Sequence, residues 1–185
     1  MRPSSQTPTI NTGSMADIAF LLLIFFLVTT TLQSDVGIAR KLPRPCPTGD
    51  CAVDVAARNL LSIHVNDAGD LLVNNDMTSF GQLRNTLREF IDNNGDQSCF
   101  YCRGSNSELS SENPNKAVIS VNTDRQTPYK YFIKVQNEIN IVYYELREKY
   151  ACSIFNKDID DLSRMEQQTV QDAYPMLIAE ADIKQ

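Results

Sequence analysis

One carboxylate stands inside the longest apolar stretch of this sequence. From Met15 to Leu32, Asp17 is the only residue with an ionisable side chain. An acid at the centre of a membrane helix costs about 2.5–3.5 kcal/mol, so such residues usually face protein or water and often carry protons. The alternative is an interfacial acid near a helix N-terminus, where the helix dipole favours negative charge. Because Asp17 follows Met15 and Ala16 inside the run, we favour a proton-transfer role.

A helix through this stretch places several residues near the face that carries Asp17. At about 100° per residue, Val28 and Thr31 lie within about 40° of the acid. A face with a carboxylate at one end and a hydroxyl at the other suits a proton route lined by protein. A lone helix would expose the acid to hydrocarbon, so we expect Phe20, Ile24 and Val28 to contact other helices.

Cysteines are the second set of residues that could do chemistry. Cys46 and Cys51 lie in "CPTGDC", Cys99 and Cys102 lie in "CFYC", and Cys152 is left over. C-x-x-C is a zinc-ligand spacing, but the first pair is spaced differently and the second lies in a predicted loop. We therefore favour disulfides or free thiols over a metal site, with a possible disulfide between Cys46 and Cys51. Close pairs in a small domain suit an oxidising compartment.

Other chemistry is not indicated. The sequence has no phosphate-binding loop, nucleophile elbow or His-rich metal set, so we expect neither an enzyme nor a cofactor. The net charge is −6 without a basic stripe, which argues against nucleic-acid binding. The single histidine, His64, falls on the outward side of a predicted strand, and a surface or edge role is favoured over catalysis.

The apolar stretch that carries Asp17 is long enough to cross a bilayer. Eighteen residues at about 1.5 Å each give roughly 27 Å, against ~30 Å of hydrocarbon. A cleaved signal peptide is disfavoured because the leader has one basic side chain and no A-x-A cleavage pattern. We predict a tail (1–12), a membrane span (13–33), a proline-containing linker (34–58) and a folded domain (59–185). Basic residues after the span weakly favour a cytoplasmic location for the domain that follows it. The cysteines instead favour an oxidising compartment outside the cytoplasm.

Hydrophobic periodicity predicts a small α+β domain with helices on one face of a mixed sheet. "LLSIHVNDAGDLLVNN" predicts a hairpin that turns at Gly69. Ser79 with Gln82 forms a capping box before a helix. Residues 95–115 lack periodicity and predict a mobile loop in which Cys99 and Cys102 bind no metal.

The second half of the domain is predicted to contain two further strands and two further helices. "KAVISVN" predicts a buried strand, and a long helix follows with Thr127 as N-cap and Pro128 at the first helical position. Its apolar stripe could face the sheet or a partner subunit, and we favour the sheet. A polar helix at 158–171 and a last strand in "PMLIAEADI" complete the domain.

The span, "GSMADIAFLLLIFFLVTTT", closely resembles that of the ExbD/TolR family, in particular the ExbD-type biopolymer transport proteins of Bacteroidetes. "GIARKLP", "VQNEINIVYYELREKYA" and "YPMLIAEAD" are similar to the same subgroup. The loop at 95–115 and the cysteines depart from the family's pattern. The length of the polar helix at 158–171 indicates an insertion before the last strand.

The resemblance implies a motor driven by the proton motive force. In the family, two copies place their spans inside a pentameric ExbB ring in the inner membrane, and the motion is passed to TonB, which opens outer-membrane transporters. The family's span aspartate falls on Asp17. The resemblance also places the N-terminus in the cytoplasm and a dimerising domain in the periplasm. Alternatives are a TolR-like subunit of a Tol-Pal envelope motor, a gliding or secretion motor subunit, and a membrane-anchored binding module.

Overall fold

The computed structural model describes residues 12–29 and 55–180. The chain divides into two compact units, Met1–Ala39 and Arg40–Gln185. The predictions for Thr31, Cys46 and Cys51 lie outside the described residues.

The described part of the first unit is one helix, α1 (Thr12–Thr29). It is apolar around its whole circumference, none of its residues is buried, and it is long and apolar enough to cross a membrane. The Thr29 hydroxyl donates to the Phe25 carbonyl at 2.7 Å, so this polar group is satisfied within the helix. The structure thus describes the predicted span as far as Thr29.

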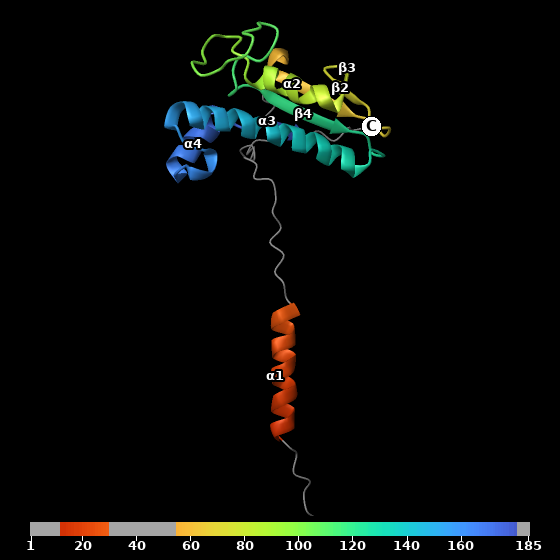
Figure 1. The fold of residues 1–185 in the computed structure, drawn as a ribbon. Helices are drawn as coiled ribbons and strands as arrows, with labels where there is room; N and C mark the ends of the chain where they lie inside the picture. The colour runs from red at the N-terminus through yellow and green to blue at the C-terminus, as the bar shows by residue number, and fades with distance from the viewer. Residues whose placement is uncertain (1–11, 30–54, 181–185) are drawn as a thin grey trace, which may run out of the picture. The chain divides into compact units, whose positions relative to one another are not determined.

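A five-stranded mixed sheet forms the centre of the second unit (Figure 1). Its spatial order is β3-β2-β1-β4-β5, with parallel pairing of β4 to β1 and β5, and antiparallel pairing of β2 to β1 and β3. The strands are β1 (Leu60–Val65), β2 (Leu71–Val73), β3 (Asp76–Thr78), β4 (Val118–Thr123) and β5 (Ile178–Glu180).

The predicted hairpin is confirmed, and the structure adds a strand to it. Gly69 takes a φ of +90° in the turn between β1 and β2, as its position in the sequence suggested. The third strand, β3, was not predicted from the sequence. Asn74 and Asn75 both have positive φ, which turns the chain tightly enough for β3 to pair with β2 before the next helix begins.

Two helices, α2 (Phe80–Ile91) and α3 (Tyr129–Phe155), cover one face of the sheet. On β1, Ile63 and Val65 are fully buried, whereas Ser62 and His64 are partly exposed on the other face. Side chains from both helices join the same core as the buried strand residues. The predicted fold class is therefore confirmed.

Helix starts match the sequence prediction at α2 but not at α3. Ser79 caps α2, and its backbone N–H donates to the Gln82 side chain at 3.3 Å. The prediction of Thr127 as the cap of α3 is wrong by one residue, because Pro128 occupies the cap and the helix begins at Tyr129. The Thr127 hydroxyl instead donates to the Val65 carbonyl at 3.1 Å, which ties the helix start to β1.

The polar helix is also shorter than the predicted range 158–171. The 3₁₀ turn Ile159–Asp161 comes first, and α4 runs over Arg164–Ala173. Ser163 accepts a bond from the Glu166 backbone N–H while the Glu166 carboxylate accepts one from Ser163 N–H at 2.7 Å. This capping box fixes where α4 begins.

The segment 95–115 contains no helix or strand, as predicted. Two adjacent amides hold its base. The Asn94 side chain exchanges two hydrogen bonds of 2.9 Å with the backbone of Cys99, and buried Asn93 exchanges bonds of 2.9 and 3.0 Å with Ser107. The mobility of the segment stays a prediction, and these bonds restrain its base.

Candidate functional site

The predicted proton-transfer residue, Asp17, lies in the second turn of α1. Phe20, Ile24 and Val28 are 58%, 42% and 69% exposed. In an ideal helix Ile24 and Val28 lie about 20° to either side of Asp17, and Phe20 about 60° away. The described part of the predicted face is therefore a carboxylate followed by three large apolar side chains.

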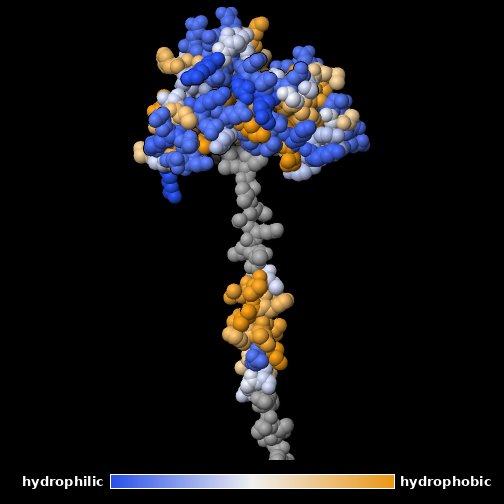
Figure 2. Space-filling model, viewed as in Figure 1, coloured by the Kyte–Doolittle hydropathy of each residue, from blue (hydrophilic) through white to orange (hydrophobic). Residues whose placement is uncertain are grey.

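The electrostatic character of α1 depends on this one residue. Figure 2 shows a helix whose visible surface is largely hydrophobic, with a hydrophilic group towards its N-terminal end. Asp17 is the only ionisable residue between Thr12 and Thr29. The described helix therefore carries one carboxylate on an otherwise apolar surface.

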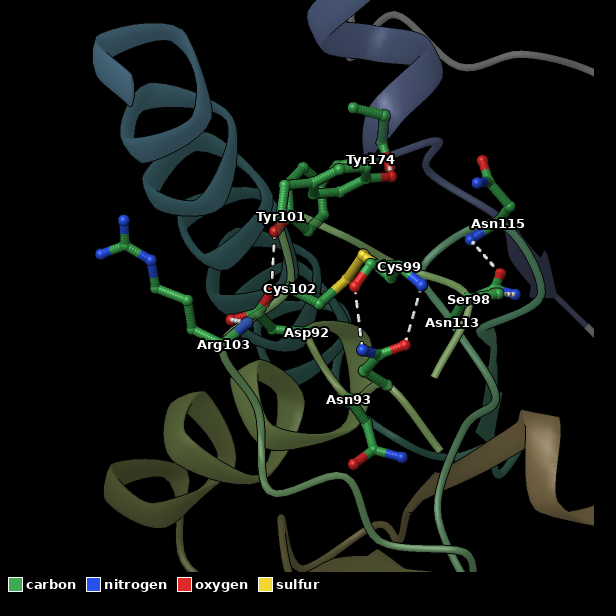
Figure 3. Close-up of a disulfide and its surroundings, with 12 residues drawn as sticks. Asp92, Asn93, Ser98, Cys99, Tyr101, Cys102, Arg103, Asn113, Asn115 and Tyr174 are labelled. Carbon is green, nitrogen blue, oxygen red and sulfur yellow. Dashed lines mark hydrogen bonds between the residues drawn. A yellow bond between two sulfur atoms is a disulfide. The ribbon is translucent and has the colours of Figure 1, made fainter. Parts of the chain in front are cut away.

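The structure decides among the alternatives for Cys99 and Cys102, which form a disulfide with a Cα–Cα distance of 5.6 Å (Figure 3). Cys99 is buried and Cys102 is partly exposed. Cys152 is free and exposed. Within residues 12–29 and 55–180, no group of three or more His, Cys, Asp or Glu side chains is arranged to hold a metal ion.

The ring of residues that the disulfide closes contains Tyr101, which belongs to an aromatic cluster (Figure 3). The Tyr101 hydroxyl donates to the Ala173 carbonyl at the end of α4 at 2.7 Å. Its ring meets Tyr150 and Tyr174 edge-on, with centroid distances of 4.8 and 5.4 Å. The ring between Cys99 and Cys102 thereby joins the loop to the ends of α3 and α4.

The same cluster contains a partly buried carboxyl group, Asp92, that no sequence pattern indicated. The Tyr174 hydroxyl donates to Asp92 Oδ1 at 2.7 Å, and Arg103 N–H donates to Oδ2 at 3.3 Å. Burial raises the pKa of Asp92, and the bond from Tyr174 opposes this effect. Asp92 and Tyr174 are far apart in the sequence, so no local pattern connects them.

His64 lies on the sheet face that the helices leave uncovered. Its Nε2 atom is 3.5 Å from Asp124 Oδ1, and both side chains are partly exposed. This position agrees with the predicted surface role. It differs from an edge role, because β1 is the central strand.

Comparison with known proteins bears on the region that contains Asp17. The family described as biopolymer transport protein ExbD/TolR matches residues 3–146. Among curated proteins, no sequence matches the chain. The family match contains all of α1 and the second unit up to Leu146 within α3, while the Bacteroidetes subgroup stays a prediction. Because the match covers most of the sequence and includes the span with its single acid, the chain belongs to the ExbD/TolR family.

Proposed function

We propose that this protein is an ExbD-type subunit that works with an ExbB-type pentameric ring to energise TonB-dependent transport across the outer membrane. The ExbD/TolR family transduces energy for transport and is not an enzyme family. Its members are single-pass inner-membrane proteins that form dimers and work with ExbB- or TolQ-type partners. The observation that carries the proposal is Asp17, the one ionisable residue of α1.

Asp17 accepts a proton from one side of the membrane and releases it toward the other. One charge that crosses 100 mV carries about 2.3 kcal/mol, which is comparable to the cost of placing an acid in the bilayer. Proton transfer at this position can therefore change which arrangement of α1 is favoured. That change in α1 is the motion that the complex passes to TonB.

Partner helices are required by the chemistry of the acid. Two copies of α1 packed only against each other would bring two carboxylates together, and these repel when both are charged. A ring that offers hydroxyl groups can hydrogen-bond each Asp17 separately and leave it free to exchange its proton. Phe20, Ile24 and Val28 then contact either the second copy or the ring.

The orientation follows the family's arrangement, with the tail (1–12) in the cytoplasm and the α+β domain in the periplasm. The disulfide between Cys99 and Cys102 supports this side of the membrane for the domain, because disulfides persist in oxidising compartments.

Replacement of Asp17 tests the proposal. Asp17→Asn keeps the shape of the side chain but cannot carry the proton, so we expect energy-coupled uptake of chelated iron to be abolished while the protein is still made and assembled with its ring. The readout is growth on chelated iron in a strain that lacks the chromosomal gene. Asp76→Asn, the same change at an exposed position in β3, is the matched control and should grow normally.

Normal uptake by Asp17→Asn would refute the motor assignment. A defect in envelope integrity, seen as sensitivity to detergent with uptake intact, would instead favour a TolR-like role.

A further inference from the structure

A groove of about 260 Å³ opens between the disulfide loop and the last turns of α3. Its walls include Phe100 and Arg103 from the loop and Lys149, Tyr150 and Ile154 from α3. These three α3 residues follow Leu146, where the family match ends. The groove is therefore formed partly by residues that follow the family match and partly by the disulfide loop, which lies inside it, and nothing in the proposed function uses the groove.

The most exposed apolar side chain at this groove is Phe100, which is fully exposed. A single exposed aromatic residue is unremarkable by itself. Here, however, the backbone of Phe100 is constrained on both sides, because it lies inside the ring that Cys99 and Cys102 close. The next residue, Tyr101, is fixed by its bond to the Ala173 carbonyl. Because the ring limits the backbone freedom of Phe100, a partner that binds its side chain has less backbone entropy to restrict.

The charge at the rim is opposite to that of the whole chain. The sequence carries a net charge of −6, yet Arg103 and Lys149 both line the groove. In the described part of the chain, neither side chain forms an ion pair. Figure 3 shows the Arg103 side chain extending away from the aromatic cluster. Two unpaired cations beside an apolar surface complement a ligand that combines carboxylates with an apolar group.

A carboxylate, that of Asp92, also lines the groove and interacts electrostatically with both cations. Both oxygens of Asp92 are engaged, one by the Tyr174 hydroxyl and the other by the Arg103 backbone N–H. Asp92 therefore offsets part of the positive charge. Within the described residues, however, it forms no ion pair with the Arg103 guanidinium or the Lys149 ammonium, so both groups can still bond to an external partner.

We propose that this groove binds a short acidic segment of a partner protein, whose apolar side chain packs on Phe100 and Ile154 while a neighbouring carboxylate pairs with Arg103 and Lys149. The interaction is a protein-docking function of the periplasmic domain. It is independent of Asp17, so it can fail while the motor assignment holds.

A peptide probe tests this docking site on the full chain in nanodiscs of neutral lipid. The probe is a fluorescein-labelled hexapeptide in which two aspartates flank a phenylalanine, and its binding is measured by fluorescence anisotropy. The matched peptide carries asparagines in place of both aspartates. We expect the acidic peptide to bind more tightly than the amide peptide, and to bind more weakly as salt concentration rises.

Charge-removing variants locate the binding site. Arg103→Gln combined with Lys149→Gln should weaken binding of the acidic peptide about tenfold. Arg125→Gln combined with Lys130→Gln removes the same charge from exposed residues at the other end of α3 and should leave affinity unchanged. Phe100→Ser, at a fully exposed position that leaves the core intact, should weaken both peptides.

Three outcomes would overturn the proposal. They are equal affinity for the acidic and amide peptides, equal affinity of the Arg103/Lys149 double variant and the control double variant, and no binding up to the solubility limit of the peptide.

Discussion

At the residue scale, Asp17 and the disulfide differ in what surrounds them. The side chains around Asp17 on α1 are apolar and exposed, so the proton transfer that we propose for it requires groups from partner helices. The residues around Cys99 and Cys102 come from the same chain and satisfy one another through hydrogen bonds and aromatic contacts. The described part of the chain therefore completes the surroundings of the disulfide but not those of Asp17.

The surroundings of Asp17 can be tested by cysteine crosslinking. If α1 packs inside a ring, Ile24→Cys, on the Asp17 face, should crosslink to a larger multispan partner or to the second copy. Phe26→Cys lies about 180° from Asp17 and is the comparison position. Labelling of position 24 by lipid-phase probes, with no partner adduct, would mean that this face stands in lipid.

At the element scale, short-range polar contacts decide where α2 and α4 begin, and long-range ones join helices to each other. Arg84 of α2 pairs with Glu138 of α3 at 2.9 Å. Arg88, one turn further along α2, pairs with Glu145, about two turns further along α3. The hydrogen bond to Glu138 raises the pKa of Arg84. These partly exposed pairs fix the alignment of α2 along α3 more than they add stability.

The start of α4 gives a prediction for pH dependence. A hydrogen bond from Lys157, assisted by bonds from Ser163, lowers the pKa of Glu166 to about 2 from an ordinary 4.5. A carboxyl whose folded-state pKa is depressed stabilises the fold above the unfolded value, and this contribution is lost as pH falls through the folded value. Glu166→Gln keeps the capping box but removes the charge. The variant should therefore melt at a slightly lower temperature than the wild type at pH 7.

Thermal unfolding between pH 7 and pH 2 checks this expectation. The difference between wild type and Glu166→Gln should shrink over the interval from about 4.5 to 2. Glu108→Gln, at an exposed position in the loop at 95–115, should show no such pH-dependent difference. A difference for Glu166→Gln that stays constant over the whole range would contradict the assigned role of its charge.

At the scale of the whole molecule, the second unit has one principal core, formed by the inner face of the sheet with α2 and α3. Leu87 is fully buried in it, whereas Leu109 in the loop is 92% exposed. Leu87→Ala should lower the free energy of unfolding by about 2–5 kcal/mol, because it leaves a cavity among packed side chains. Leu109→Ala should change it by less than about 0.5 kcal/mol.

Chemical denaturation of the full chain, monitored by a probe in the second unit, measures both values. Equal effects of the two substitutions would show that the core is not packed as described.

The sequence by itself determined the features that depend on neighbours within a few residues. A continuous apolar run with one acid predicts the span with Asp17, and the Ser79–Gln82 capping box marks the start of α2, because bilayer thickness and helix caps act on contiguous residues. Only the tertiary structure decided the rest. Three-residue β3 is too short to show a period, and it exists because it pairs with β2. The disulfide was one of several alternatives until the fold brought Cys99 against Cys102, and the bond between Tyr174 and Asp92 joins groups that only folding places together.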